Sequence, residues 1–299
     1  MGDTVLTTPA LALLKRARPD LKISVVLERP WERLLESNSD VWSVIVFERN
    51  RRGRTLAALR RLEPQLCLNL HGGPTSAWLT ALSGARWRAG FGHFGLRAAY
   101  NVKIPRAQEM LGRPTDAPVH TADHLASAMF YLGVEPTEIP PARLFAKPWR
   151  REGPYAVLHV AAADPGKQWP AERFAELAHW LRRTQGLEPI LLAGPGQGEL
   201  LAGMKEFVTF DDQSLGEMME LVQGCELFVG NDSGPAHVAA AFGIPCVVIF
   251  GSSSSAVWRP WRTRCQVVES PQGISSVQTG AVEQAAEAVL AGRPALRHD

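Results

Sequence analysis

Short apolar segments alternate with amphipathic segments along almost the whole chain, and this alternation constrains the fold more than any other feature. In the second half, the apolar segments near 155–160, 188–193, 207–210, 225–230, 245–250 and 265–268 are typical of strands. The segments between and after them, near 170–185, 214–223, 235–243 and 281–291, have the spacing of helices. Strands that alternate with helices form βαβ units, which build a parallel sheet covered on both faces.

The first half shows the same alternation, with strands expected near 21–27, 44–47, 65–70 and 88–92. Helices are expected near 9–18, 31–37, 54–62, 75–84 and 120–133. A length of 299 residues fits two such domains of about 150 residues each. The segment 134–154 contains five prolines and no periodicity, which is typical of a linker. We therefore predict an N-terminal domain over 1–148 and a C-terminal domain over 149–299.

The first residues differ from the usual start of such a domain. Thr8-Pro9 is typical of a helix start, with Thr as the N-cap and Pro at the first helical position. The sequence thus predicts a loop over residues 2–7 that leads into the first helix. In a doubly wound sheet a strand precedes that loop. We therefore expect the first strand to be missing from the chain as written.

Charge is distributed unevenly between the two halves. Residues 1–150 hold 21 Lys and Arg against 13 Asp and Glu, a balance of +8, whereas residues 151–299 hold 11 against 17, a balance of −6. Much of the basic excess lies in Arg49, Arg51, Arg52, Arg54, Arg60 and Arg61. Such a run indicates an anionic partner, such as a phosphorylated glycolipid or a membrane surface. The alternative interpretation is a helix face exposed to solvent. It contains no interleaved aromatic residues and no nucleic-acid-binding module is visible, so nucleic acid is not expected as a partner.

Cysteine and histidine spacing predicts neither a metal nor a disulfide. Cys67, Cys225, Cys246 and Cys265 lie far apart and form no CxxC pair, so we expect buried free thiols. His120 and His124 could face one side of a helix, but no third ligand accompanies them, so no metal is predicted. Neither a secretory signal nor an apolar stretch of about 20 residues is present, which favours the cytoplasm.

Two loops follow predicted strands and precede predicted helices. Gly230-Asn231-Asp232-Ser233-Gly234-Pro235-Ala236-His237 opens a helix, and a helix N-terminus attracts phosphate oxygens. Plain capping of the helix by Asp232 or Ser233 explains the same pattern. The segment 159–170 carries Lys167, whose ammonium could offset phosphate charge. Both loops lie where ligands bind in parallel sheets, at the carboxyl ends of strands.

Taken in order, several segments resemble glycosyltransferase family 9, the heptosyltransferase family. They are the opening Gly2-Asp3 with the helix after it, Lys167-Gln168-Trp169-Pro170, Asn231-Asp232-Ser233-Gly234 with His237, Phe250-Gly251-Ser252, and Trp258-Arg259-Pro260. His120 with Leu132-Gly133 resembles the helix before the linker. The resemblance covers nearly the whole chain, and the combination is specific although no single motif is.

The resemblance implies a GT-B fold, in which two Rossmann-like, doubly wound domains face each other across a cleft. It implies an N-terminal domain that binds the acceptor and a C-terminal domain that binds the nucleotide sugar. The reaction implied is inverting transfer of heptose from ADP-heptose to the lipopolysaccharide core, without a cofactor. An anionic glycolipid acceptor and peripheral contact with the cytoplasmic face of the inner membrane fit the basic N-terminal half.

The resemblance also suggests roles for individual residues. Asp3 matches the catalytic base, with capping of the first helix, or a frayed terminal residue without a role, as the alternatives. Lys167, Asp232, Ser233, Gly234 and His237 match the donor-binding residues. The acceptor is expected near Arg51, Arg52 and Arg54. The residues Ala161-Ala162-Ala163 depart from the hydroxyl residues that heptose-transferring members often carry there. A transferase or epimerase that uses another nucleotide sugar, or a non-catalytic nucleotide or glycan binder, therefore remains as an alternative.

Overall fold

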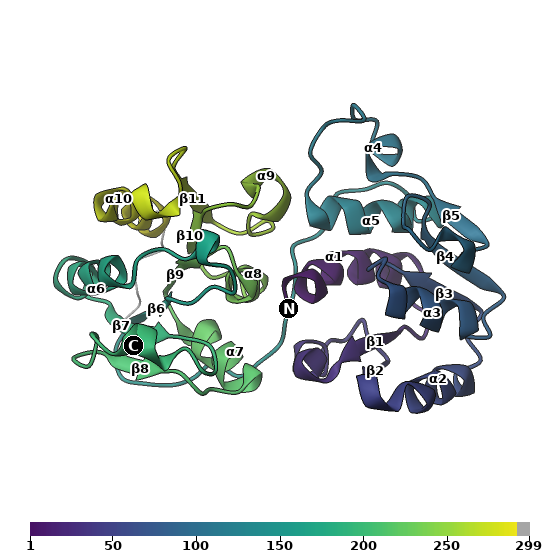
Figure 1. Ribbon diagram of the computed structural model, residues 1–299, viewed down its shortest axis with the longest axis horizontal. Helices are drawn as coiled ribbons and strands as arrows, with labels where there is room; N and C mark the ends of the chain where they lie inside the picture. The colour runs from purple at the N-terminus through teal and green to yellow at the C-terminus, as the bar shows by residue number, and fades with distance from the viewer. Residues whose placement is uncertain (292–299) are drawn as a thin grey trace. The chain divides into compact units, whose positions relative to one another are not determined.

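The computed structural model describes residues 1–291. Two compact units emerge from its contacts: residues 7–140 form one, and Met1–Leu6 join the chain from Pro141 onward in the other. The division falls inside the proline-rich segment, between Pro140 and Pro141, whereas the sequence placed the domain boundary after residue 148. Figure 1 shows the helices and strands of each unit.

The C-terminal unit is built on one parallel sheet of six strands in the order β11-β10-β9-β6-β7-β8. The strands are β6 (Tyr155–His159), β7 (Glu188–Leu192), β8 (Val208–Phe210), β9 (Leu227–Asn231), β10 (Cys246–Phe250) and β11 (Cys265–Glu269). All residues of β6, β9 and β10 are buried, as expected for strands covered on both faces. Each of the six strands was predicted within a few residues of its observed bounds.

Helices cover both faces of this sheet. On one face α6 (Ala171–Trp180) contacts β7 and α10 (Thr279–Leu290), and α10 contacts β9, β10 and β11. On the other face α8 (Gly234–Ala241) contacts β9, β10 and α7 (Leu215–Gly224) (Figure 1). Shorter elements complete the unit: η4 (Pro165–Lys167), η5 (Leu181–Gln185), η6 (Gly198–Leu201), α9 (Ser255–Trp258) and η7 (Ile274–Ser276).

The strand order changes direction at β6. After β6 the chain adds β7 and β8 on one side, then returns to place β9 against the opposite edge of β6. The residues that follow β6 and β9 therefore leave neighbouring strands and lead into helices on opposite faces. A crevice forms at the carboxyl ends of two strands with this arrangement, and ligands bind there in doubly wound sheets.

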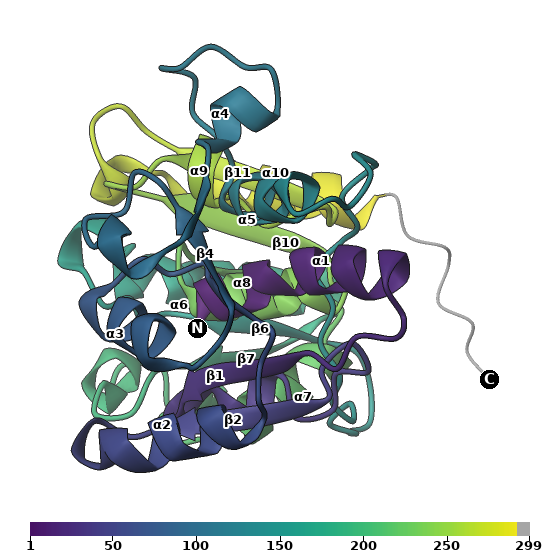
Figure 2. The same ribbon diagram turned by 90° about the vertical axis from the view of Figure 1, so that its right-hand side faces the viewer.

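In the N-terminal unit the parallel strands form two sheets and not one. β1 (Ser24–Glu28) pairs with β2 (Ser43–Phe47) (Figure 2). The strands β3 (Leu66–Asn69), β4 (Trp87–Phe91) and β5 (Val102–Ile104) form the second sheet (Figure 1). The helical elements are η1 (Arg29–Leu34), η2 (Arg49–Arg51), α2 (Arg52–Arg61), α3 (Pro74–Leu82), η3 (Arg97–Ala99), α4 (Ala107–Met110) and α5 (Thr121–Tyr131). A doubly wound sheet without its first strand was expected, and because that strand is normally central, the division into two sheets agrees with the expectation. Among the described residues, no strand pairs with the free edges of β1 and β3.

The prediction for the first residues was wrong in one respect. Helix α1 (Gly2–Ala17) already begins at Gly2, so residues 2–7 are not a loop and Pro9 lies inside the helix. An interior proline removes one backbone hydrogen bond and costs about 3 kcal/mol. Burial offsets that cost: Val5, Leu6 and Leu13 are at most 1% exposed, and each such side chain contributes about 1.5–3 kcal/mol. Packing therefore overrides the local signal of Thr8-Pro9.

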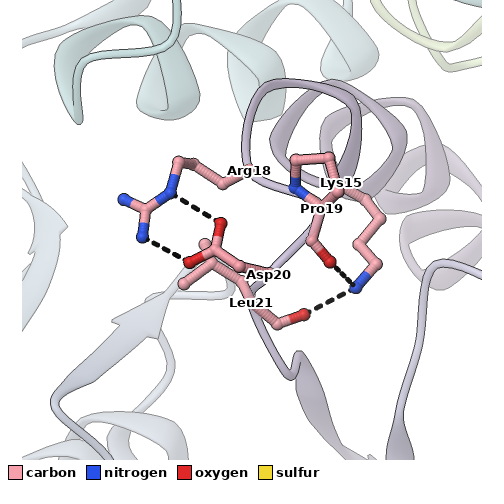
Figure 3. Close-up of polar contacts among 5 residues, drawn as sticks. All are labelled: Lys15, Arg18, Pro19, Asp20 and Leu21. Carbon is pink, nitrogen blue, oxygen red and sulfur yellow. Dashed lines mark hydrogen bonds and ion pairs between the residues drawn. The ribbon is translucent and has the colours of Figure 1, made fainter.

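Helix α1 ends in a tight polar turn that leads toward β1. The Lys15 ammonium donates to the carbonyl oxygens of Pro19 and Leu21, each at 2.7 Å (Figure 3). The guanidinium of Arg18 makes a two-pronged ion pair with the Asp20 carboxylate at 2.8 and 2.6 Å. A lysine that binds carbonyl groups after the last turn is a common way to end a helix.

The remaining differences from the predictions are small and local. The expected helix at 31–37 is the 3-10 helix η1, which has Pro30 near its start. Strand β5 and helix α4 are too short to show a period and were not predicted. All four cysteines are free, but Cys67 and Cys265 are partly exposed where burial was expected. Each of these two side chains ends up in a strand that lies at or near a sheet edge.

The position of Pro9 can be tested by substitution. We expect Pro9→Ala to stabilise the protein by about 1–3 kcal/mol, because alanine restores the hydrogen bond that proline cannot make inside a helix. Thermal or urea unfolding measures this change. Pro74→Ala is the matched control, since Pro74 occupies the start of α3, where proline is favourable. A neutral or destabilising Pro9→Ala would mean that the helix starts at Thr8.

Candidate functional site

The turn after β9 forms the centre of the candidate site. Asn231 ends the strand, and the backbone N–H of Asp232 donates to the Ile249 carbonyl at 3.1 Å, which holds the turn against β10. Ser233 occupies the N-cap position of α8 in an extended conformation, without a capping hydrogen bond from its side chain. Capping by Ser233, one of the alternatives, therefore does not explain this residue.

Lys167 approaches this turn from the loop after β6. Its ammonium lies 2.8 Å from Oδ2 of Asp232, and the two side chains are 30% and 5% exposed. The Asp164 carboxylate accepts the Gly166 N–H at 2.8 Å and so begins the short helix η4 that carries the lysine. The structure thus joins Lys167 and Asp232 across 65 residues of sequence.

A third loop, which follows β10, completes the arrangement. The Ser253 hydroxyl donates to Oδ2 of Asp232, the same oxygen that Lys167 contacts. The backbone N–H of Ser252 donates to the Gly166 carbonyl at 3.1 Å. A Cβ added to Gly251 would collide with that carbonyl oxygen, so only glycine allows the two loops to approach this closely.

Ser233 and His159 connect the same strand ends. The Ser233 hydroxyl lies 3.5 Å from Nδ1 of His159, the last residue of β6. Burial lowers the pKa of His159 to about 4, so the imidazole is neutral at neutral pH. A neutral imidazole can accept or donate this hydrogen bond and adds no positive charge beside Lys167.

The first residues of the chain lie on the start of α8. A Cβ added to Gly2 would lie 2.8 Å from Cδ2 of His237, and one added to Gly234 would lie 2.6 Å from Sδ of Met1. Asp3 is exposed in the first turn of α1, one residue after this contact. His237 is 4% exposed. The Met1 side chain thus lies directly against Gly234.

The three arginines expected near the acceptor belong to the N-terminal unit. Arg51 ends η2, and Arg52 and Arg54 lie in the first turn of α2, directly after β2. All three are exposed. Arg51 pairs with Glu48 at 3.5 Å, and Nε of Arg52 donates to a backbone carbonyl at 3.2 Å. They therefore present positive charge at the carboxyl end of a strand.

The histidine pair considered for a metal has other contacts. Nδ1 of His120 accepts the Ala122 N–H at 3.0 Å and caps helix α5. The His124 ring stacks on Phe91 with 4.0 Å between ring centroids, and burial lowers its pKa to about 4. Within residues 1–291, no group of three or more His, Cys, Asp or Glu side chains is arranged to hold a metal ion.

Sequence reasoning missed two side chains of the site. Ser253 lies in a run of four serines after a buried strand, a position at which a hydroxyl group commonly faces a ligand, and this signal was available. Asn231 stands inside the recognised segment, but only the structure shows that its amide bonds the loop after β6. A side chain that contacts backbone 62 to 71 residues away leaves no local pattern in the sequence.

Comparisons with known proteins agree with this architecture. The profile of Glycosyltransferase family 9 (heptosyltransferase) matches residues 52–285. Lipopolysaccharide heptosyltransferase 3 of Escherichia coli is 26% identical to this chain in an alignment 309 residues long, gaps included. The alignment covers 87% of this chain and 83% of that protein. In the part of the chain that the structure describes, no helix is both long and apolar enough to cross a membrane.

Two solved structures show the same fold. A glycosyl transferase family 9 protein from Veillonella parvula superposes with a TM-score of 0.82 at 23% identity, covering 98% of this chain and 94% of that chain. E. coli ADP-heptose lps heptosyltransferase II gives a TM-score of 0.81 at 21% identity, covering 97% and 96%. The two Rossmann-like units are therefore those of a GT-B fold, and with the family profile covering most of its length the chain belongs to glycosyltransferase family 9, the heptosyltransferase family.

Proposed function

We propose that this protein catalyses the inverting transfer of heptose from ADP-heptose to an acceptor in the lipopolysaccharide core. The observation that carries the proposal is the Lys167–Asp232 pair at 2.8 Å, which lies at the change of strand order beside the N-terminus of α8. Membership of the heptosyltransferase family supports the choice of sugar, and the names of the relatives support the choice of acceptor.

The diphosphate of the donor would bind beside Lys167. Its ammonium and the partial positive charge of the α8 N-terminus act on the same small region, and both favour phosphate oxygens. Asp232 holds the lysine side chain in place before the ligand arrives, which reduces the rotamer entropy lost on binding. As the bond between the anomeric carbon and the diphosphate breaks, the same charges stabilise the leaving ADP.

Asp3 would take the proton from the acceptor. In inverting transfer, the acceptor oxygen attacks the anomeric carbon opposite the leaving diphosphate, and a carboxylate accepts the hydroxyl proton in the same step. Asp3 is exposed, and the Gly2–His237 contact fixes its backbone next to the start of α8. His237 would act through this contact, by holding the first turn of α1 in position.

The acceptor would bind to the N-terminal unit through its anionic groups. Arg51, Arg52 and Arg54 offer exposed guanidinium groups, which bind phosphate in a two-pronged geometry. We propose that the reaction takes place in the cytoplasm, with the basic unit in peripheral contact with the inner membrane that holds the acceptor lipid. No cofactor takes part in this scheme.

The donor assignment can be tested by calorimetric titration with ADP, UDP and GDP. We expect ADP to bind most tightly, and Lys167→Ala to weaken ADP binding by about 10- to 100-fold, the value of one charge-assisted hydrogen bond. Lys205→Ala is the matched control, because Lys205 is an exposed lysine of the same unit outside the site. It should leave affinity unchanged.

Other outcomes of this titration are equally informative. Preference for UDP or GDP would keep the fold and the site but replace the donor, as the alanines at 161–163 allow. Failure of all three nucleotides to bind would contradict the proposed donor site and favour a non-catalytic relative.

The role of Asp3 can be tested by steady-state transfer from ADP-heptose to purified core lipid. We expect Asp3→Asn to lower kcat by about 10²- to 10⁴-fold, because the amide cannot accept the proton. Affinity for ADP should stay within about twofold, since Asp3 does not contact the nucleotide in this scheme. Asp20→Asn, at an exposed ion pair after the same helix, is the control. An unchanged kcat in Asp3→Asn would remove Asp3 from the mechanism.

A further inference from the structure

Asn231, the last residue of β9, is fully buried and uses its amide group on a distant loop. Oδ1 accepts the backbone N–H of Trp169 at 3.0 Å. Nδ2 donates to the carbonyl oxygens of Val160 at 3.1 Å and Ala161 at 3.4 Å. The acceptor and both donor positions of a primary amide can thus be satisfied by backbone groups.

These bonds hold both ends of the loop that carries Lys167. Val160 and Ala161 follow β6 directly, and Trp169 stands two residues after the lysine. The indole Nε1 of Trp169 donates in turn to the Val277 carbonyl at 2.9 Å, which anchors that end of the loop in the core. One amide therefore closes a segment of ten residues onto the end of β9.

Asn231 also precedes Asp232, the partner of Lys167. Asn231 thus connects the two residues of the ion pair. It is bonded directly to Asp232 through the peptide bond, and its side chain hydrogen-bonds Trp169, which stands two positions after Lys167. A change at Asn231 alters the spacing between the loop and the turn, and the lysine reaches Asp232 only when that spacing is kept.

We propose that Asn231 is a positioning residue of the donor site, which sets the location of the Lys167 ammonium and thereby the affinity for the nucleoside diphosphate. The inference rests on the proposed function in one respect, namely that Lys167 contacts the diphosphate. The hydrogen bonds of the Asn231 amide go to protein backbone, not to Lys167. Leucine has a similar volume but would remove the Asn231 hydrogen bonds to one buried N–H and two carbonyl groups.

A double-mutant cycle separates positioning from general stability. ADP affinity and thermal unfolding are measured for wild type, Asn231→Ala, Lys167→Ala and the double variant. We expect Asn231→Ala to weaken ADP binding about tenfold when Lys167 is present, and less than about threefold when it is absent. The fall in Tm caused by Asn231→Ala should be about equal in both backgrounds. Equal losses of affinity in the two backgrounds would overturn the proposal.

Asn69→Ala provides the matched control. Asn69 is also a buried asparagine at the end of a strand, in the N-terminal unit, where Oδ1 accepts two backbone N–H groups and Nδ2 donates to Tyr100. It should lower Tm as Asn231→Ala does and leave ADP affinity within about twofold. A tenfold loss of ADP affinity in Asn69→Ala would show that loss of any such amide weakens binding, which would also overturn the proposal.

A second variant keeps the test decisive if Asn231→Ala does not fold. Asn231→Asp retains the acceptor for Trp169 but replaces the two donors by an oxygen that faces two carbonyl groups. It should show the same dependence on Lys167, and affinity should recover as the pH falls and the new carboxyl group gains a proton to donate. If UDP or GDP binds in place of ADP, the proposed donor fails, and the cycle is run with the nucleotide that binds.

Discussion

The reversal of strand order at β6 is the constraint on which the rest of the site depends. Because β7 and β9 lie on opposite sides of β6, the segments after β6 and β9 start side by side and then separate toward different faces. The ladder between the two strands ends at His159 and Gly230, and the segments after them no longer pair with each other. Backbone groups of these segments that find no other backbone partner must be satisfied by side chains, water or a ligand. Polar residues are therefore expected at the carboxyl ends of β6 and β9, although both strands are buried in the apolar core.

In this protein, side chains from three loops fill part of that requirement. The Asn231 amide satisfies the loop after β6, Ser253 and Lys167 satisfy Asp232, and the Ser252 N–H satisfies the Gly166 carbonyl. Three loops from different parts of the sequence thus form one hydrogen-bonded network. Such a network is rigid because each loss exposes a buried polar group, which costs about 1–3 kcal/mol.

The sequence predicted the regular parts of the fold well because they depend on local periodicity. All strands of the C-terminal unit lie within a few residues of their predicted positions, and the sequence indicates both Lys167 and Asp232 as candidate site residues, which the structure joins in one ion pair. The start of helix α1 was predicted wrongly, because Pro9 is held inside the helix by burial of the surrounding side chains, which no short window of residues encodes. The split of the N-terminal strands into two sheets agrees with the expected absence of the first strand, which is normally central in a doubly wound sheet.

The hydrogen bond from Ser253 to Asp232 affects how Lys167 can bind a diphosphate. A diphosphate has to compete with the Asp232 carboxylate, which is 5% exposed, for the Lys167 ammonium. If the lysine left Asp232 without another partner, the buried carboxylate charge would be costly. The Ser253 hydroxyl donates to the same carboxylate oxygen as the lysine. When a donor binds under the proposed function, the Lys167 ammonium can move toward the phosphates, because Asp232 keeps its hydrogen bond from Ser253. The serine thus lets one lysine be held by a carboxylate before binding and serve the ligand afterwards.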